Sequence, residues 1–282
     1  MRKTKSYIKL MRVKHYMKNV LVLVSLFFSK NFFCQEKLIP AILGVVSFCL
    51  ISSAVYIVND LNDVEKDRNH PTKCKRPIAS GAVSKLQANI LLLICIAGSI
   101  VLSLMTGKAL SLIYILLYFV LNIAYSLGLK NQPILDIVLL TSGFVIRVMY
   151  GAFITNTIIS SWLFLVIVTG SFYLGLGKRR NEIKLNADSR DVLKHYNYAF
   201  LDKNMHVCLG LTNVFYALWA KEFENPYMLY TVPLVLVIFM KYSLDIEGDS
   251  DGDPVEVVIK DKILIAISAV YAASVAVLLY LV

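Results

Sequence analysis

Four oxygen-bearing side chains with helical spacing occur at the start of the segment NDLNDVEKDRNHPTKCKRPIASG, residues 59–81. If a helix runs through this segment, Asn59, Asp63 and Asp67 lie at positions i, i+4 and i+8 of one face, and Asp60 lies beside them. Mg²⁺ takes oxygen ligands and is usually held by one or two carboxylates together with substrate phosphates and water. The spacing therefore predicts that these four residues bind Mg²⁺ and that the three aspartates are catalytic.

Basic side chains follow the acids directly. Arg68, Lys73 and Arg76 can bind phosphate oxygens that a metal ion does not reach, so the acids and bases together favour a phosphorylated ligand. The alternative is a solvated loop beside a membrane, in which the bases only orient the chain. That alternative accounts for the bases but not for four acids at helical spacing at a membrane edge.

The composition decides which solvent surrounds this motif. The chain has 282 residues, of which 57% are hydrophobic, and its mean hydropathy is +0.65. Soluble domains are only about 45–50% apolar. The five cysteines have no ligand-like spacing and give no indication of a disulfide framework or a zinc site. We therefore expect an integral membrane protein.

Apolar runs of about 17–25 residues, the length that a spanning helix needs, recur along the sequence. They predict one all-α transmembrane domain over residues 1–282, built as a bundle of nine helices. The expected spans are 17–34, 38–58, 86–105, 109–127, 133–155, 158–176, 204–221, 227–243 and 262–282.

The lysines and arginines indicate how these spans are oriented. A cytoplasmic N-terminus places all but five of the 29 basic residues on the cytoplasmic side, as bacterial-type membrane proteins require. The exceptions are Lys30, Lys37, Lys108, Arg147 and Lys221. The net charge of +10 then needs no nucleic-acid partner. The long connections 59–85 and 177–203 both face the cytoplasm, where a soluble reactant can enter while a lipid enters from between the helices.

Two charges are expected inside one spanning helix. Asp136 and Arg147 lie about three helical turns apart, roughly 16 Å along the axis, which is too far for a direct ion pair. Ionisable groups at that depth usually face a polar cavity, so both are expected to line a pocket. The alternative is that each is a buried structural charge bound to neighbouring carbonyl groups.

Four segments in order resemble a known family. The first fits the pattern NDxxDxxxD of the UbiA superfamily of intramembrane prenyltransferases, and all four are similar to its decaprenyl-phosphate phosphoribosyltransferase branch. The resemblance implies a nine-helix bundle with a cytoplasmic, Mg²⁺-dependent active site. It also implies transfer of phosphoribose from phosphoribosyl pyrophosphate (PRPP) to a polyprenyl phosphate, for cell-envelope glycan synthesis. The segments are NDLNDVEKDRNHPTKCKRPIASG, YSLGLKNQPILDIVLLTSGFVIRVMYGA, LGKRRNEI and GDPVEVVIKDKIL.

The chain departs from the wider superfamily after the sixth expected span. Prenyl-transferring members carry a second aspartate motif, DxxxD, at this place, whereas this chain has Lys178, Arg179 and Arg180. The nearest acids are Glu182, Asp188 and Asp191, of which Glu182 is a further candidate for lining the pocket. The three bases favour a ligand with an additional phosphate, such as the 5-phosphate of PRPP or the head of the lipid. Their alternative role is a positively charged membrane anchor.

Two further places are candidates for phosphate binding by the same resemblance. Lys18 and Asn19 stand in the family's basic entry to the first span, and Tyr125 and Lys130 close the fourth. A basic and aromatic interfacial anchor explains the residues before Lys18 equally well.

Two other functions remain open at this point. An ordinary prenyltransferase would move a prenyl group from a diphosphate to a small acceptor, and it predicts the DxxxD motif that this chain lacks. A transporter would line a through-route with its buried charges, but the sequence has no evident internal repeat. The sequence does not decide the lipid chain length, or between a monomer and a homo-oligomer.

Overall fold

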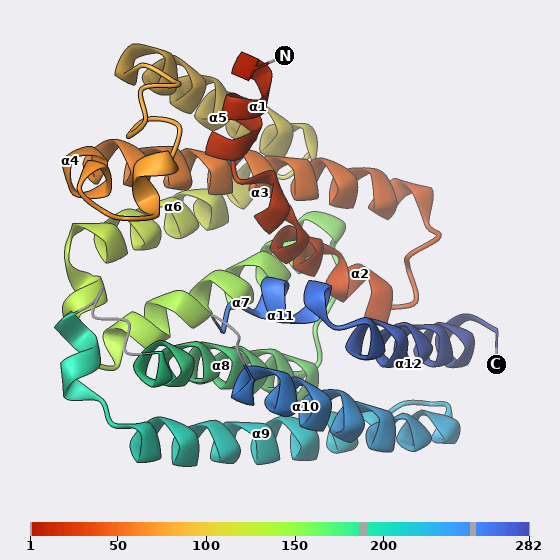
Figure 1. Ribbon diagram of the computed structural model, residues 1–282. Helices are drawn as coiled ribbons and strands as arrows, with labels where there is room; N and C mark the ends of the chain where they lie inside the picture. The colour runs from red at the N-terminus through yellow and green to blue at the C-terminus, as the bar shows by residue number, and fades with distance from the viewer. Residues whose placement is uncertain (1, 186–190, 249–251, 282) are drawn as a thin grey trace. The chain divides into compact units, whose positions relative to one another are not determined.

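A computed structural model gives the fold and describes residues 2–185, 191–248 and 252–281. Every regular element in these residues is a helix, so the expected all-α class is confirmed (Figure 1). The chain forms two compact units. Unit 1 contains Met1–Gly128 and Ile146–Thr157, and unit 2 contains Leu129–Val145 and Ile158–Val282.

Unit 1 is organised around one long helix, α3 (Gln35–Asn62). Apolar residues occur on all sides of α3, which is typical of a helix enclosed by others, and Phe48 and Ile57 are fully buried in the core. Around it lie α1 (Arg2–Leu10), η1 (Val13–Leu23), α2 (Val24–Phe28), α4 (Val64–Arg68), η2 (Lys73–Lys75), α5 (Lys85–Met105), η3 (Ala109–Ser111), α6 (Leu112–Leu127) and the second half of α7 (Leu135–Thr155).

Unit 2 is built on the packing of two long helices, α8 (Ser161–Lys184) and α9 (Tyr198–Lys221). Its core includes the fully buried side chains of Tyr173, Leu201 and Ile246. The remaining elements are η4 (Leu129–Asn131), the first half of α7, η5 (Asp191–His195), η6 (Pro226–Thr231), α10 (Val232–Glu247), α11 (Pro254–Lys260) and α12 (Lys262–Tyr280).

Seven helical segments in the described residues are long and apolar enough to cross a bilayer. The protein is therefore a multi-pass membrane protein. These segments correspond to seven of the nine expected spans: Gln35–Asn62, Lys85–Met105, Ala109–Leu127, Leu135–Thr155, Ser161–Lys184, Pro226–Glu247 and Lys262–Tyr280.

The other two expected spans differ in structure. The span predicted at 204–221 is helical within α9, but Asn204, His206 and Asn213 make it more polar than the seven. The span predicted at 17–34 is not one α-helix, because the chain forms the 3₁₀-helix η1 over eleven residues and then the short α2. Such long 3₁₀ runs are uncommon and often mark strain or a functional segment.

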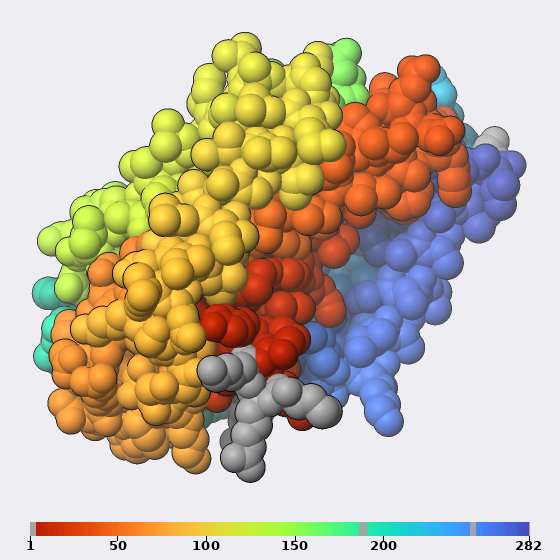
Figure 2. All heavy atoms as spheres, turned by 90° about the horizontal axis from the view of Figure 1, so that it is seen from above, coloured from red at the N-terminus to blue at the C-terminus, as the bar shows by residue number. Residues whose placement is uncertain are grey.

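A glycine in α7 lets η1 pack closely against α7 within unit 1. A Cβ atom added to Gly151 would lie 1.9 Å from the carbonyl oxygen of Val22, so no larger residue fits without moving the backbone. The N-terminal segment is also held at its other end. Lys9 donates a hydrogen bond of 2.8 Å to the carbonyl of Lys75, and the red N-terminal residues lie beside the orange-to-gold part of unit 1 in Figure 2.

Candidate functional site

The acidic motif lies where α3 ends and α4 begins, in unit 1. The helical hydrogen bonds continue across the junction, because the Asp63 amide donates to the Asn59 carbonyl (3.0 Å) and the Asp67 amide donates to the Asp63 carbonyl (2.8 Å). The helical spacing inferred from the sequence is thus present, although Asp63 itself separates two helices. The connection ends at α5, where Ser84 and Gln87 form a capping box.

Two of the four acidic-motif residues converge on one guanidinium group. Asp60 and Asp67 are each only 3% exposed. Arg76 donates from Nη1 to Asp67 Oδ2 at 2.7 Å and to Asp60 Oδ1 at 3.2 Å. Asp60, Asp67 and one of the predicted bases therefore form a single cluster.

A second arginine joins this cluster from far away in the sequence. Arg12 Nη2 donates to Asp60 Oδ1 at 2.7 Å, and its guanidinium lies 4.6 Å from the centre of the Tyr56 ring. Arg12 has a left-handed backbone (φ 52°, ψ 47°) at the start of η1, which is uncommon for a residue with a side chain. Arg12 belongs to the basic entry to the first expected span, which an interfacial anchor explains equally well, and no local signal connects it to an acid 48 residues later.

The donor atoms suit Mg²⁺ only if a ligand contributes as well. Asn59 Oδ1 accepts a hydrogen bond of 2.6 Å from Ser126, and Asp63 is half-buried beside the converging pair. In the described part of the chain, no three carboxylate, imidazole or thiolate groups gather as a metal cage. Two converging carboxylates nevertheless match the usual mode of Mg²⁺, which shares substrate phosphates and keeps several waters.

Two other predicted phosphate ligands of unit 1, Arg68 and Lys73, make no hydrogen bond or ion pair with Asp60 or Asp67 among the described residues. Arg68 is half exposed and pairs with Glu65 at 3.2 Å on the surface of α4. Lys73 begins η2 and is half-buried, as are Lys18 in η1 and Tyr125 near the end of α6. The structure therefore brings Arg76, but not Arg68, to the predicted metal ligands.

Arg147 is the centre of a buried polar network in unit 1. Its Nε donates to Asn19 Oδ1 at 2.7 Å, and its Nη2 donates to the Tyr118 hydroxyl at 2.9 Å and to Ser52 at 3.3 Å. Arg147 is 5% exposed and Asn19 is fully buried. Because Asn19 belongs to η1, this network holds the 3₁₀ segment against α3, α6 and α7.

Asp136 lies in a second acid-base cluster, in unit 2. It is fully buried and accepts hydrogen bonds from Arg179 Nε at 2.5 Å and from the Tyr196 hydroxyl at 2.6 Å. Arg179 also donates to Glu182 at 2.7 Å. Burial, followed by the hydrogen bond to Asp136, raises the pKa of Tyr196 to about 12, so the phenol stays a donor at neutral pH.

The three consecutive bases of α8 point to three different places. Lys178 pairs with Asp253 at 3.4 Å, Arg179 pairs with Asp136, and Arg180 pairs with Asp202 and Glu247. This divergence follows from helix geometry, since successive residues are rotated by about 100°. The structure therefore does not gather Lys178, Arg179 and Arg180 into one phosphate clamp.

The neighbouring residues of unit 2 complete the predicted set. Lys130 is half-buried in η4. Asp191 is exposed, and a hydrogen bond from Lys194 lowers its pKa. Asp188 lies outside the described residues. Gly252 has φ +73°, and a Cβ there would lie 3.1 Å from Lys178 Cα. The Gly-Asp-Pro segment 252–254 therefore packs closely on the basic end of α8.

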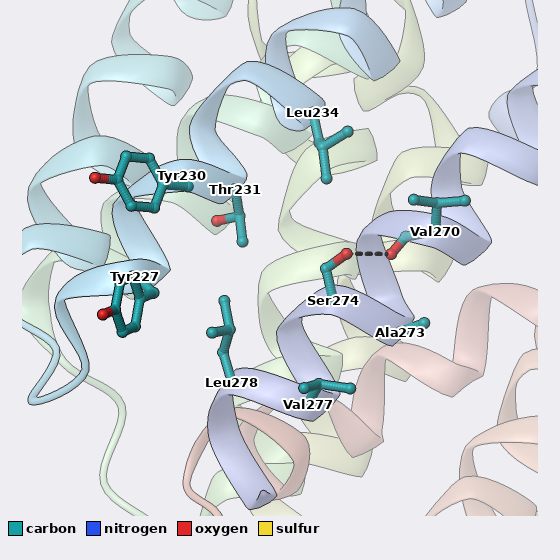
Figure 3. Close-up of a pocket in the computed structure, with 9 residues that line it drawn as sticks. All are labelled: Tyr227, Tyr230, Thr231, Leu234, Val270, Ala273, Ser274, Val277 and Leu278. Carbon is teal, nitrogen blue, oxygen red and sulfur yellow. Dashed lines mark hydrogen bonds between the residues drawn. The ribbon is translucent and has the colours of Figure 1, made fainter. Parts of the chain in front are cut away.

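An apolar cavity of about 590 Å³ lies elsewhere in unit 2, between η6 with the start of α10 and helix α12. In Figure 3, Tyr227 and Tyr230 stand on one side, and Val270, Ser274 and Val277 on the other. The residues that line it include no charged side chain. It is therefore unsuited to a phosphorylated group, and the charged clusters are the better candidates for chemistry.

Comparison with known proteins gives consistent matches over most of the chain. The model of the UbiA prenyltransferase family matches residues 20–260. A decaprenyl-phosphate phosphoribosyltransferase of Corynebacterium glutamicum is 34% identical, and the match covers 91% of this chain and 81% of that protein. An enzyme of the same name from Mycolicibacterium smegmatis is 31% identical, with coverages of 91% and 87%.

The fold also matches solved structures. A UbiA homolog from Archaeoglobus fulgidus bound to GPP and Mg²⁺ has a TM-score of 0.74 at 17% identity, covering 97% of this chain and 99% of that one. At this identity the likeness shows a shared fold.

Proposed function

Because this chain belongs to the UbiA prenyltransferase family, we propose that it is a membrane phosphoribosyltransferase, transferring 5-phosphoribose from PRPP to a polyprenyl phosphate. The observation that carries the proposal is the Asp60–Asp67 pair held by Arg12 and Arg76, in a chain similar to two decaprenyl-phosphate phosphoribosyltransferases over 91% of its length. Such a cluster provides acids for a metal and bases for a diphosphate at one place.

The acids of the cluster are the proposed metal ligands. Asp60 and Asp67, with Asn59 and Asp63 beside them, would hold Mg²⁺ jointly with the diphosphate, and the bound metal would offset negative charge on the departing pyrophosphate.

The two arginines are the proposed ligands of the leaving group. Arg12 and Arg76 both pair with Asp60, Arg76 also pairs with Asp67, and each arginine is 27% exposed at the side chain. A diphosphate held at these acids therefore meets two guanidinium groups, whose planar donors suit phosphate oxygens. We assign them the binding and orientation of pyrophosphate while the bond to C1 breaks.

The reaction is a substitution at the anomeric carbon of PRPP. The C1–O bond breaks with its electron pair leaving on pyrophosphate, and an oxygen of the lipid phosphate forms the new bond to C1. The ribose ring oxygen stabilises positive charge at C1. Because the lipid phosphate is already anionic at neutral pH, no side chain has to act as general base, and most of the catalysis comes from electrostatics and positioning.

The bases of α8 have unequal access to a phosphate group. Arg179 is fully buried against Asp136, whereas Lys178 is 21% exposed and lies 3.4 Å from Asp253. Lys178 is therefore our preferred phosphate ligand in unit 2. Lys18, Tyr125 and Lys130, all half-buried, are weaker candidates for the lipid head.

The second candidate function is prenyl transfer to a small acceptor. Two solved structures of a UbiA homolog from A. fulgidus contain GPP and DMAPP, and both share this fold. The basic residues of α8 in place of DxxxD favour phosphoribosyl transfer instead.

The proposal is tested with protein purified in detergent, Mg²⁺, radiolabelled PRPP and a polyprenyl phosphate. We expect a labelled phosphoribosyl lipid and released pyrophosphate, and we expect EDTA to stop both. Transfer from geranyl diphosphate to an aromatic acceptor, without label in the lipid, would instead support the second candidate. In the organism, we expect the enzyme in the cytoplasmic membrane and its product in cell-envelope glycan synthesis.

A further inference from the structure

A groove of about 560 Å³ lies within unit 2, at the adjoining ends of α8, α9 and α10. The end of α8, the start of α9 and the end of α10 provide polar lining residues, while the next turns of α9 and α10 provide apolar ones. The groove is therefore polar at one end and apolar at the other, which is the polarity of a membrane lipid.

The polar end is built around a buried guanidinium group. Arg180 is 3% exposed and contacts Asp202 through Nη1 and Glu247 through Nη2 (2.5 Å). Its guanidinium carbon lies 5.3 Å from the centre of the Tyr198 ring. The Nε–H of Arg180 is buried and has no hydrogen-bond partner among the described residues, which leaves one donor for a ligand.

The charges of this end suit a zwitterion. The lining residues contribute one guanidinium, the imidazole of His206 and two carboxylates, Asp202 and Glu247, whose side chains are 31% and 44% exposed. His206 lies 3.5 Å from Asp202, and Lys184 lies 3.5 Å from Glu247. A head group with a phosphate and an ammonium can pair with both kinds of charge at once. A lipid with a phosphate alone would place its negative charge beside two acids, at a cost in affinity.

The groove runs from its polar end to an open apolar surface. From Asp202 to Leu209 on α9, and from Glu247 to Met240 on α10, the groove runs about 10 Å along the helices. Met240 and Leu244 are 69% and 66% exposed, so this end is open at the protein surface. Methionine adapts easily to the shape of a flexible partner.

We propose that this groove binds one zwitterionic phospholipid with a primary amine, of the phosphatidylethanolamine class. Its phosphate accepts from Arg180, its ammonium lies at Asp202 and Glu247, and one acyl chain follows Met240 and Leu244. The site uses no residue of the Asp60–Asp67 cluster and does not depend on the proposed reaction.

The test measures lipid binding by native mass spectrometry and by thermal unfolding in detergent. Dioctanoyl phosphatidylethanolamine is compared with the phosphatidylglycerol of the same chains, which has a phosphate but no amine. We expect one retained phosphatidylethanolamine per chain and an affinity about tenfold higher than for phosphatidylglycerol. Equal affinities would overturn the proposal.

Two variants and a matched control locate the site. Met240→Trp fills the apolar end without touching the ion pairs, and it should weaken phosphatidylethanolamine binding at least about fivefold. Asp202→Asn keeps an acceptor for Arg180 but removes a charge, and it should reduce the preference for the amine. Val214→Trp, on an exposed part of α9 outside the groove, should change neither.

Two other results would contradict the lipid-binding proposal. Unchanged lipid binding by Met240→Trp, or displacement of phosphatidylethanolamine by farnesyl phosphate at equal concentration, would show that the groove does not select this lipid. If Asp202→Asn fails to fold, the two-lipid comparison and Met240→Trp still decide the proposal.

Discussion

Each unit contains a cluster in which arginine binds aspartate: two aspartates in unit 1 and one in unit 2. The two clusters differ in their access to solvent. In unit 1, Asp60 and Asp67 are buried while Arg12 and Arg76 are each 27% exposed. In unit 2, Asp136 and Arg179 are both fully buried. An arginine with access to solvent can exchange its carboxylate for a phosphate, whereas a sealed pair contributes mainly to the folded structure. The first cluster is thus suited to binding and the second to positioning α7 against α8.

The largest expected effect is on turnover and belongs to unit 1. Asp60→Asn and Asp67→Asn should each lower kcat by about 10³-fold, because electrostatic groups at a reacting charge typically contribute this much. Their unfolding temperatures should change little, since the arginines are left partly solvated. Glu65→Gln, an exposed acid of the same segment, is the control and should retain activity. Full activity in Asp67→Asn would show that the cluster is structural.

The next effect is on stability and belongs to unit 2. Asp136→Asn and Arg179→Met should each lower the free energy of unfolding by about 3–5 kcal/mol, because each removes one partner of a fully buried ion pair. The double variant should recover part of the loss. Denaturant unfolding in detergent measures the free energy of unfolding of the wild type, the two single variants and the double variant. Lys194→Ala, which breaks the exposed pair with Asp191, should cost less than about 1 kcal/mol. A loss in the double variant equal to the sum of the two single losses would argue against a coupled pair.

A smaller effect separates binding from chemistry in unit 1. Arg12→Lys and Arg76→Lys keep the charge but lose the planar pair of donors, so the KM for PRPP should rise about tenfold with a smaller change in kcat. Steady-state kinetics at saturating lipid measures this, and Lys66→Ala on the exposed side of α4 is the control. An unchanged KM would remove the arginines from donor binding.

The smallest effect tests the hydroxyl that completes the unit 2 cluster. Tyr196→Phe removes the hydrogen bond to Asp136 and should destabilise the protein by about 1.5–3 kcal/mol at pH 8. The folded pKa is raised to about 12 from the ordinary value of 10. The contribution is therefore fully present below about pH 10 and is lost as the pH rises toward 12. The stability difference between wild type and Tyr196→Phe should shrink between pH 8 and pH 11; a constant difference would contradict this assignment.

The sequence predicts what depends on local spacing. The family inferred from four segments is confirmed, and so are the helical class and seven of the expected spans. The spacing of Asn59, Asp63 and Asp67 predicts their common helical face, because hydrogen bonds four residues apart are the same in any helix. The assignment of the four residues to Mg²⁺ stays a prediction.

Local spacing in the sequence does not predict contacts between segments that are far apart along the chain. Arg12 reaches Asp60 through the left-handed turn before η1, and Tyr196 reaches Asp136 from the position directly after η5. Lys178, Arg179 and Arg180 were expected to bind phosphate, but helix geometry separates them. Three consecutive helical residues cannot face one ligand, so the rotation of about 100° per residue already implies three separate partners.

The 3₁₀ geometry of η1 changes how far a short apolar segment can reach. At a rise of about 2.0 Å per residue, the eleven residues of η1 extend about 22 Å, and the five residues of α2 add about 7 Å. Together they approach the ~30 Å thickness of a hydrocarbon core, for which an α-helix needs about 20 residues. A 3₁₀-helix, with its longer rise, thus lets the 16 residues Val13–Phe28 extend nearly as far as about 20 residues of an α-helix, and Gly151 provides the narrow space that the backbone of η1 needs.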